Sequence, residues 1–283
     1  MTNTQIATSP AGVASDGAQA GGRIIVLMEN RSESPDLASE HGLSLWIETP
    51  ECAVLFDTGQ SPAFASNARK LGVDLGSATA IVLSHGHYDH AGGLEHALSA
   101  TTAPLYLGEN ATVPKRARGE AGMRDIGMDA SLAKRYSERV RAVSSRREIL
   151  PGIEVLPAAP LETRPPSDNE RLLRETSDGL DRDPFEDELS LLVHAPDQDV
   201  LVTGCSHRGI VNIYRQAGRP PIVVGGLHLS HEPDGRVREV AEQLADAAEL
   251  WVGHCTGDRA VEILAEELPG KVRPIRAGTA LPL

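Results

Sequence analysis

Three histidines and one aspartate are crowded into residues 85–90, directly after a short apolar run at residues 80–83. The apolar run predicts a buried strand, so the polar run predicts a loop at the end of that strand. Crowded imidazoles and a carboxylate cost stability unless they bind something, and they are ligands that zinc, iron and manganese favour. The run therefore predicts a strand-end loop that can serve two neighbouring metal ions. In order it reads His85, Gly86, His87, Tyr88, Asp89 and His90.

Short apolar runs of β type alternate with helical patterns along the whole chain. Helical spacing of apolar side chains predicts helices at residues 62–71, 236–250 and 259–268. That many strands require two sheets, and helices that enclose two packed sheets bury both apolar faces. We expect strands at residues 24–28, 43–47, 54–56, 80–83, 105–107, 153–156, 189–193, 200–203, 222–224, 250–252 and 272–275.

The N-terminal composition differs from that of the rest of the chain. Residues 1–22 almost lack large apolar side chains and predict a flexible tail, so a single domain is expected over residues 23–283. The tail has neither the basic start nor the apolar stretch of a secretory signal, and no later segment has the roughly 18 to 20 apolar residues that cross a bilayer. Cys52, Cys205 and Cys255 make no disulfide framework. Together these features predict a cytoplasmic protein without membrane attachment.

Charge is distributed unevenly along the chain. The net charge of −13 repels polyanions, so nucleic acid is not an expected partner. Residues 115–147 depart from this balance, with ten Lys and Arg against four Asp and Glu, a net charge of +6. A solvated helical surface and a mobile cover that attracts an anionic substrate are both open interpretations. Residues 161–188 are charged and carry three prolines, so we expect a long loop, of the kind that often borders an active site.

The polar run and several further strings resemble a known family. The run, the Gly-Gly-Leu that follows it and the upstream Leu-Phe-Asp-Thr-Gly at residues 55–59 resemble the metallo-β-lactamase superfamily. Strings at residues 40–45, 203–212, 225–229 and 253–257 are similar to the subgroup of 7,8-dihydropterin-6-methyl-4-(β-D-ribofuranosyl)aminobenzene-5'-phosphate synthase-like proteins. The resemblance covers residues 23–283 and implies an α/β fold, a four-layer αβ/βα sandwich with metals at one edge between the sheets.

The resemblance also implies a ligand set. His85 and His87 match the residues that hold the first metal, and Asp89 and His90 match those that hold the second. His254 matches the late histidine that completes the second site. Asp57 matches the aspartate that orients the metal loop by hydrogen bonding rather than by ligation.

The chain departs from the superfamily pattern at the remaining ligands. That pattern has a histidine before the strand at residues 200–203 and a bridging aspartate directly after it. Here His194 stands at a strand end and is expected to be structural, while Cys205 occupies the place of the aspartate and His207 follows two residues later. We expect His207 to be a ligand and keep Cys205 as a possible ligand, because small buried cysteines are commonly inert packing.

These residues favour a hydrolase that uses water activated by two divalent ions, zinc first, with iron or manganese as alternatives. Asp89 and His228 are the expected catalytic residues, and His41 and Glu40 are candidates for lining the same cavity. The expected partner is a small anionic ester, thioester, amide or phosphate, and the oligomeric state is open. A pterin-pathway transferase or synthase and a metal-based redox enzyme are the alternative functions, since fold alone does not choose a reaction.

Overall fold

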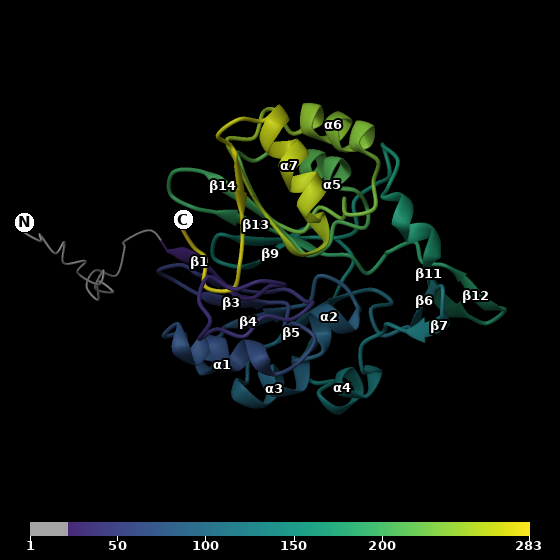
Figure 1. Ribbon diagram of the computed structural model, residues 1–283. Coiled ribbons are helices and arrows are strands. Elements are labelled where there is room, and N and C mark those ends of the chain that lie inside the picture. The colour runs from purple at the N-terminus through teal and green to yellow at the C-terminus, as the bar shows by residue number, and fades with distance from the viewer. Residues whose placement is uncertain (1–21) are drawn as a thin grey trace, which may run out of the picture.

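The computed structural model of the chain describes residues 22–283 (Figure 1), and the predicted tail falls outside them apart from Gly22. No helix in this described part is long and apolar enough to cross a membrane.

Two seven-stranded sheets form the centre of the molecule. Their inner faces pack together through one cluster of buried side chains that includes Val26, Phe56, Leu191 and Val202. In spatial order the first sheet contains β18 (Ala280–Pro282), β1 (Arg23–Met28), β2 (Ser44–Glu48), β3 (Ala53–Phe56), β4 (Ala80–Val82), β5 (Leu105–Gly108) and β8 (Val140–Val143). The second contains β17 (Val272–Pro274), β16 (Glu249–Val252), β15 (Ile222–Gly225), β14 (Asp199–Thr203), β13 (Ser190–His194), β10 (Ile153–Leu156) and β9 (Arg147–Leu150).

Helices cover the outer face of each sheet (Figure 1). Phe64 and Leu98 belong to the buried cluster outside the first sheet, and Tyr214, Val240 and Ile263 belong to the cluster outside the second. The first sheet carries α1 (Ala63–Lys70), α2 (Tyr88–Ala91), α3 (Leu94–Ala100) and α4 (Ala130–Arg135), and the second carries α5 (Ile210–Gln216), α6 (Asp234–Gln243) and α7 (Asp258–Glu267). The four-layer αβ/βα sandwich is therefore confirmed. The helix expected over residues 236–250 ends at Gln243, because β16 begins at Glu249.

A third, four-stranded sheet stands beside the sandwich and corrects two predictions. It contains β12 (Gly179–Arg182), β11 (Leu172–Thr176), β6 (Lys115–Gly119) and β7 (Gly122–Asp125). The loop expected over residues 161–188 is thus wrong, since it holds two strands and a short 3-10 helix at Ser167–Arg171. The helical surface expected over residues 115–147 is also wrong, because only Ala130–Arg135 is helical. Pairing between β6 and β11 joins these segments, and local sequence carries no sign of it.

The strand directions bring distant loops to one edge of the sandwich. β3 and β4 run parallel in the first sheet, and β14, β15 and β16 run parallel in the second. Loops at the carboxyl ends of parallel strands meet on one side of an α/β sheet, the usual place for a ligand. Asp57, His85, Cys205, His228 and His254 all follow the ends of these strands.

Candidate metal centre

The loop after β4 is held by its backbone. Gly86 stands where an added Cβ would lie 1.9 Å from the carbonyl oxygen of Ala111, so only glycine fits there. The N–H of Gly86 donates to Oδ2 of Asp187 at 2.8 Å, and its carbonyl oxygen accepts from the N–H of Met128 at 2.9 Å. These contacts fix the direction in which the histidines on either side of Gly86 point.

His85, His87 and His207 form the first group of donors. Nε2 of His85 lies 3.0 Å from Nδ1 of His87, and the ring of His207 lies within 5.0 Å of both other rings, centroid to centroid. Burial, the largest cause, lowers the pKa of each of these imidazoles well below its usual value, which favours the neutral form that binds metals. Nδ1 of His207 faces Oδ1 of Asn169 at 3.0 Å, while Nε2 is buried with no hydrogen-bond partner in the described residues.

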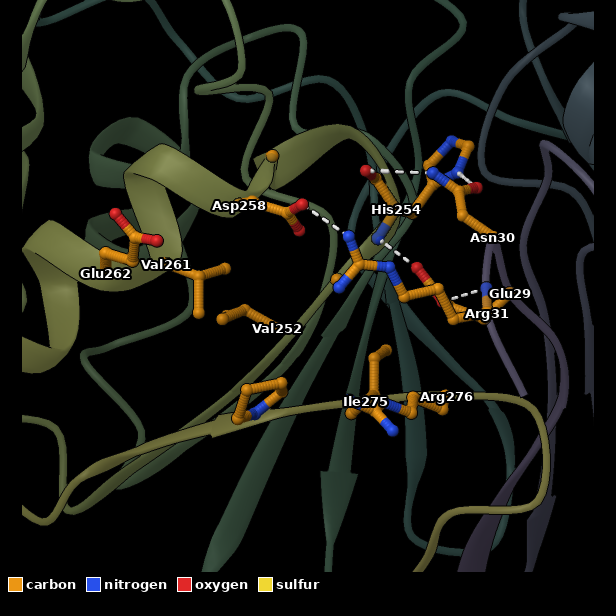
Figure 2. A pocket seen from close by; sticks show the side chains of 13 residues that line it. Glu29, Asn30, Arg31, Val252, His254, Asp258, Val261, Glu262, Ile275 and Arg276 are labelled. Atoms are coloured by element: carbon orange, nitrogen blue, oxygen red, sulfur yellow. Dashed lines mark hydrogen bonds and ion pairs between the residues drawn. The ribbon is translucent and has the colours of Figure 1, made fainter. Parts of the chain in front are cut away.

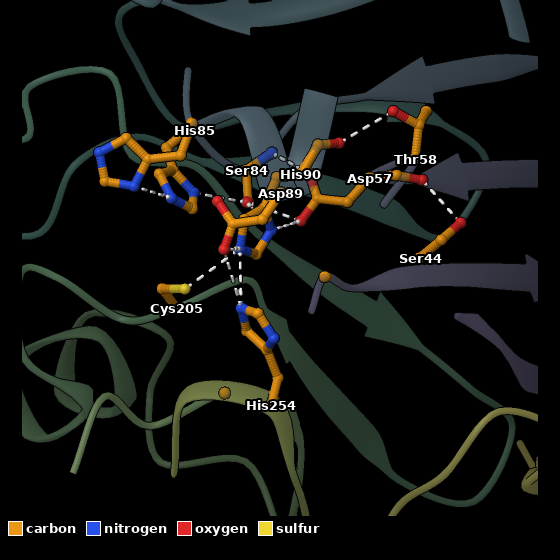
Figure 3. A network of polar contacts seen from close by, with 12 residues as sticks. Ser44, Asp57, Thr58, Ser84, His85, Asp89, His90, Cys205 and His254 are labelled. Carbon is orange, nitrogen blue, oxygen red and sulfur yellow. Dashed lines mark hydrogen bonds and ion pairs between the residues drawn. The ribbon is translucent and has the colours of Figure 1, made fainter. Parts of the chain in front are cut away.

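Asp89, His90, His254 and Cys205 form a second group beside the first (Figure 3). Nε2 of His90 lies 3.1 Å from Sγ of Cys205 and 3.2 Å from Nε2 of His254, and Oδ2 of Asp89 lies 3.5 Å from the same nitrogen of His254. Donor atoms of His85, His90 and Cys205 all lie within 4.8 Å of one another, so Cys205 stands between the groups. Cys205 and His207 thus lie in different groups of donor atoms. They are not two alternatives for one position.

Asp57 holds the second group from behind. Its carboxylate oxygen Oδ2 lies 2.7 Å from Nδ1 of His90, and Oδ1 accepts the N–H of Ser84 at 2.7 Å. All three side chains are fully buried. Burial lowers the pKa of His90, but the carboxylates of Asp57 and Asp89 outweigh it and raise that pKa to about 9. The pocket therefore favours positive charge at this position, as a bound cation would supply.

His254 is fixed from the side opposite His90. Its Nδ1 faces Oδ1 of Asn30 at 3.1 Å, which leaves Nε2 directed at the second group. Its backbone N–H donates to Oε1 of Glu29 at 2.6 Å, on the wall of a separate cavity of about 490 Å³ in which Arg31 pairs with Asp258 (Figure 2). An outer acceptor on one ring nitrogen keeps the other deprotonated and free to bind a metal.

A cavity of about 270 Å³ opens onto both groups. His228 lines it, and both of its ring nitrogens are buried without a hydrogen-bond partner in the described residues. Oδ2 of Asp168 lies 3.6 Å from Nε2 of His228, and Oδ1 of Asp168 accepts from Nε of Arg171 at 2.6 Å. Sequence reasoning missed Asp168, because it lies in the segment expected to be a loop and no local pattern sets it apart.

Other histidines and cysteines divide between the site and the surface. His41 lines the cavity, and its Nε2 lies 3.2 Å from Oδ2 of Asp89. Glu40 does not line the cavity, because its side chain accepts hydrogen bonds from the backbone of residues 60–61. His194 is exposed and pairs with Asp199, in keeping with a structural role. Cys255 shares a cluster with Cys205 and His228, and the donor atoms of these three residues lie within 4.8 Å of one another.

The donor set fits divalent metals. The two adjacent groups consist of imidazole, carboxylate and thiol side chains, which are the ligand types preferred by zinc and by several other transition metals. The unpaired Nε2 of buried His207 supports this fit, because a buried polar atom without a partner is costly. These histidine and aspartate clusters could therefore bind metal ions.

The chain is similar to known proteins in sequence and in structure. A family model described as the metallo-beta-lactamase superfamily matches residues 40–209. The crystal structure of Tm1679, described as a metal-dependent hydrolase of the beta-lactamase superfamily, is similar with a TM-score of 0.80 and 34% identity over 93% of this chain and 99% of that chain. The metallo-beta-lactamase fold protein YhfI from Bacillus subtilis shares the fold, with a TM-score of 0.58 and 13% identity over 92% of this chain and 99% of that chain.

Two proteins of Methanocaldococcus jannaschii are similar in sequence. One is an uncharacterised protein, 26% identical over 253 residues, 86% of this chain and 94% of that protein. The other is a 7,8-dihydropterin-6-methyl-4-(beta-D-ribofuranosyl)-aminobenzene-5'-phosphate synthase, 25% identical over 265 residues, 85% of this chain and 89% of that protein.

Proposed function

Because the chain belongs to the metallo-β-lactamase superfamily, we propose that it is a metal-dependent hydrolase of a small anionic ester, thioester, amide or phosphate. The observation that carries this proposal is the convergence of two donor groups on one cavity. In the proposal His85, His87 and His207 hold one ion, and Asp89, His90 and His254 hold the other, with Cys205 between them.

Two zinc ions at these groups would supply a water of lowered pKa and would polarise the attacked oxygen. The protein residues around the cavity then have separate tasks. Asp89 presents a carboxylate at the cavity wall, where it can accept the proton of the attacking water. His228 faces the same cavity and can donate a proton to the leaving group, with Asp168 holding the ring in position.

The walls of the cavity support an anionic substrate. Arg124 and Arg171 both line it, although the chain as a whole carries a charge of −13. Arg124 lies on β7 and, among the ten basic residues of the segment 115–147, is the one that lines this cavity in the described part of the chain. A guanidinium is suited to a carboxylate or phosphate, because its planar fork of N–H donors matches their oxygens. We propose that Arg124 places the anionic end of the substrate.

A second candidate function follows from one relative. The similar protein of Methanocaldococcus jannaschii is named as the synthase of a dihydropterin compound that carries a ribofuranosyl 5'-phosphate, so a transfer or condensation at the same donor groups is the alternative. Metal-based redox chemistry is a third possibility that metal analysis would identify. Cys205, in the place where the superfamily pattern has an aspartate, is the feature that sets this centre apart from ordinary hydrolases of the family.

Purified protein should hydrolyse anionic esters or phosphates faster than matched neutral esters, and only with metal bound. The measurement is turnover of paired substrates before metal removal, after dialysis against a chelator, and after zinc is restored. A parallel assay with a pterin and a ribosyl phosphate tests the alternative. Activity in that assay alone would overturn the hydrolase proposal, and activity that survives complete metal removal would overturn both.

Replacing His228 by alanine is expected to lower kcat on the order of 100-fold, because a positioned acid or base contributes about that factor or more. Asp168→Asn should cause a smaller loss, since the ring keeps its chemistry but loses its carboxylate partner. Pre-steady-state and pH–rate measurements would report both effects, and metal content should stay unchanged. His96→Ala, on the exposed face of α3, is the matched control. A His228→Ala enzyme with an unaltered pH–rate profile would remove this residue from the mechanism.

A further inference from the structure

One lysine of the basic segment is buried between two acidic side chains. Lys115 begins β6 and its side chain is 1% exposed. Its Nζ lies 2.6 Å from Oδ2 of Asp183 and 3.1 Å from Oδ1 of Asp187. Burial lowers the pKa of Lys115, but the two carboxylates outweigh it, so the ammonium stays charged. Taking a lysine and two carboxyl groups out of water is expensive, and replacing such groups by apolar residues is often neutral or stabilising. Stability alone therefore does not account for this triad.

One arm of this triad reaches the loop of the metal-binding run. The second carboxylate oxygen of Asp187, Oδ2, accepts the backbone N–H of Gly86 at 2.8 Å. Gly86 separates His85 from His87, so this hydrogen bond sets the direction of both histidines. The backbone of Lys115 supports the same loop from its other side. Its carbonyl oxygen accepts from Ile126, whose own carbonyl oxygen accepts the N–H of Tyr88.

The other arm reaches the third histidine of the same donor group. Oδ1 of Asp183 accepts the backbone N–H of Phe185 at 2.8 Å. The ring of Phe185 stacks on the imidazole of His207, with centroids 3.9 Å apart and an interplanar angle of 5°. Phe185 is non-glycine with a φ of 54°, an uncommon conformation that its surroundings must enforce. The ion pair of Lys115 with Asp183 anchors the turn that holds this ring against His207.

We infer that Lys115, together with Asp183 and Asp187, is a positioning group that aligns His85, His87 and His207 for one metal ion. The three histidines come from two loops, and Nζ of Lys115 contacts a carboxylate on the way to each. Asp187 bonds the loop of His85 and His87, and Asp183 bonds Phe185, whose ring stacks on His207. The second donor group has different supports, Asp57 behind His90 and Asn30 behind His254. The inference rests on the metal-binding part of the proposed function, and it predicts an effect confined to one of the two ions.

The test is a metal titration of Asp187→Asn and Lys115→Met against the wild-type protein. Outer partners of metal ligands typically contribute 10- to 100-fold in affinity. Each variant should therefore bind one equivalent of zinc with wild-type affinity. It should bind the other equivalent about 10- to 100-fold more weakly than the wild-type protein does, as measured by chelator competition. Cobalt titration followed by absorption should show a changed ligand field for the weakened ion. Arg116→Met is the matched control, because the neighbouring Arg116 forms its ion pairs on the outside of the small sheet.

The outcomes separate this inference from the proposed function. A wild-type protein that binds no metal contradicts the proposed function itself. The positioning inference alone is overturned if the wild-type protein binds two ions and the Asp187→Asn protein binds both with wild-type affinity. Asp187→Asn is nearly isosteric, so it decides the question if Lys115→Met does not fold. Unfolding of each metal-free variant in urea shows whether a weakened ion reflects a lost fold.

Discussion

His207→Ala is expected to remove one of two metal equivalents and to lower kcat/KM by roughly a thousandfold. The imidazole of His207 is fully buried, its Nδ1 faces Oδ1 of Asn169, and its Nε2 has no hydrogen-bond partner in the described residues. The proposed metal ion would bind this nitrogen. Loss of the ion would forfeit several kcal/mol of transition-state stabilisation, and each 1.36 kcal/mol is tenfold in rate. Metal analysis and steady-state kinetics on the same preparation would measure both effects.

The control for His207→Ala is His194→Ala, at the exposed end of β13, which should keep full metal content and activity. Parallel analysis of Cys205→Ser would show what the thiol adds. Sγ of Cys205 lies 3.1 Å from Nε2 of His90, and its cluster includes His85 but neither His87 nor His207. The serine variant should therefore retain the ion at His207. A His207→Ala protein that keeps both equivalents would contradict the assignment of His207 as a ligand.

Asp57→Ala is expected to destabilise the metal-free protein by about 3 to 5 kcal/mol, the usual cost of removing one member of a buried charged pair. The substitution would leave the N–H of Ser84 and the imidazole of His90 without the acceptor that each now has. Affinity for the metal held by His90 should fall about 10- to 100-fold, because that carboxylate orients the ring. Urea unfolding and chelator competition are the two measurements.

Asp57→Asn gives a graded comparison, because the amide oxygen can still accept from Ser84 while the negative charge is lost. It should lie between the wild-type and alanine proteins in both measurements. Asp199→Ala removes an exposed aspartate and should leave both quantities unchanged. If Asp57→Ala unfolded at the wild-type urea concentration, the buried network around His90 would not contribute to stability as its hydrogen bonds indicate.

The fold and the first part of the candidate site were predictable from local patterns. Apolar runs of strand length mark β1, β3, β14 and β15 because a buried strand shows continuous hydrophobicity. The run at residues 85–90 predicts a metal site without any other segment, because its donor side chains are close together in the chain. Such signals are short in range, and the sequence shows them directly. The late His254 was found through resemblance alone.

Contacts between distant segments were decided only by the tertiary structure. Lys115 meets Asp183 and Asp187 about seventy residues away, and in the sequence it is one of many basic residues in its segment. Asp168 contacts His228 from a segment whose prolines predicted a loop. The strands β6 and β11 lack a strong apolar pattern, because β6 is rich in basic residues and much of the small sheet is exposed.

The sequence by itself thus determined the layered fold, the six-residue run of candidate metal ligands and the family to which the chain belongs. The tertiary structure decided that Cys205 and His207 lie in different clusters of potential donor atoms, and that a buried lysine lies behind one of them. The physical reason is that a metal centre depends on where side chains converge in space. Convergence here depends on the ends of parallel strands from two sheets and on hydrogen bonds between segments, neither of which has a periodic signature in the chain.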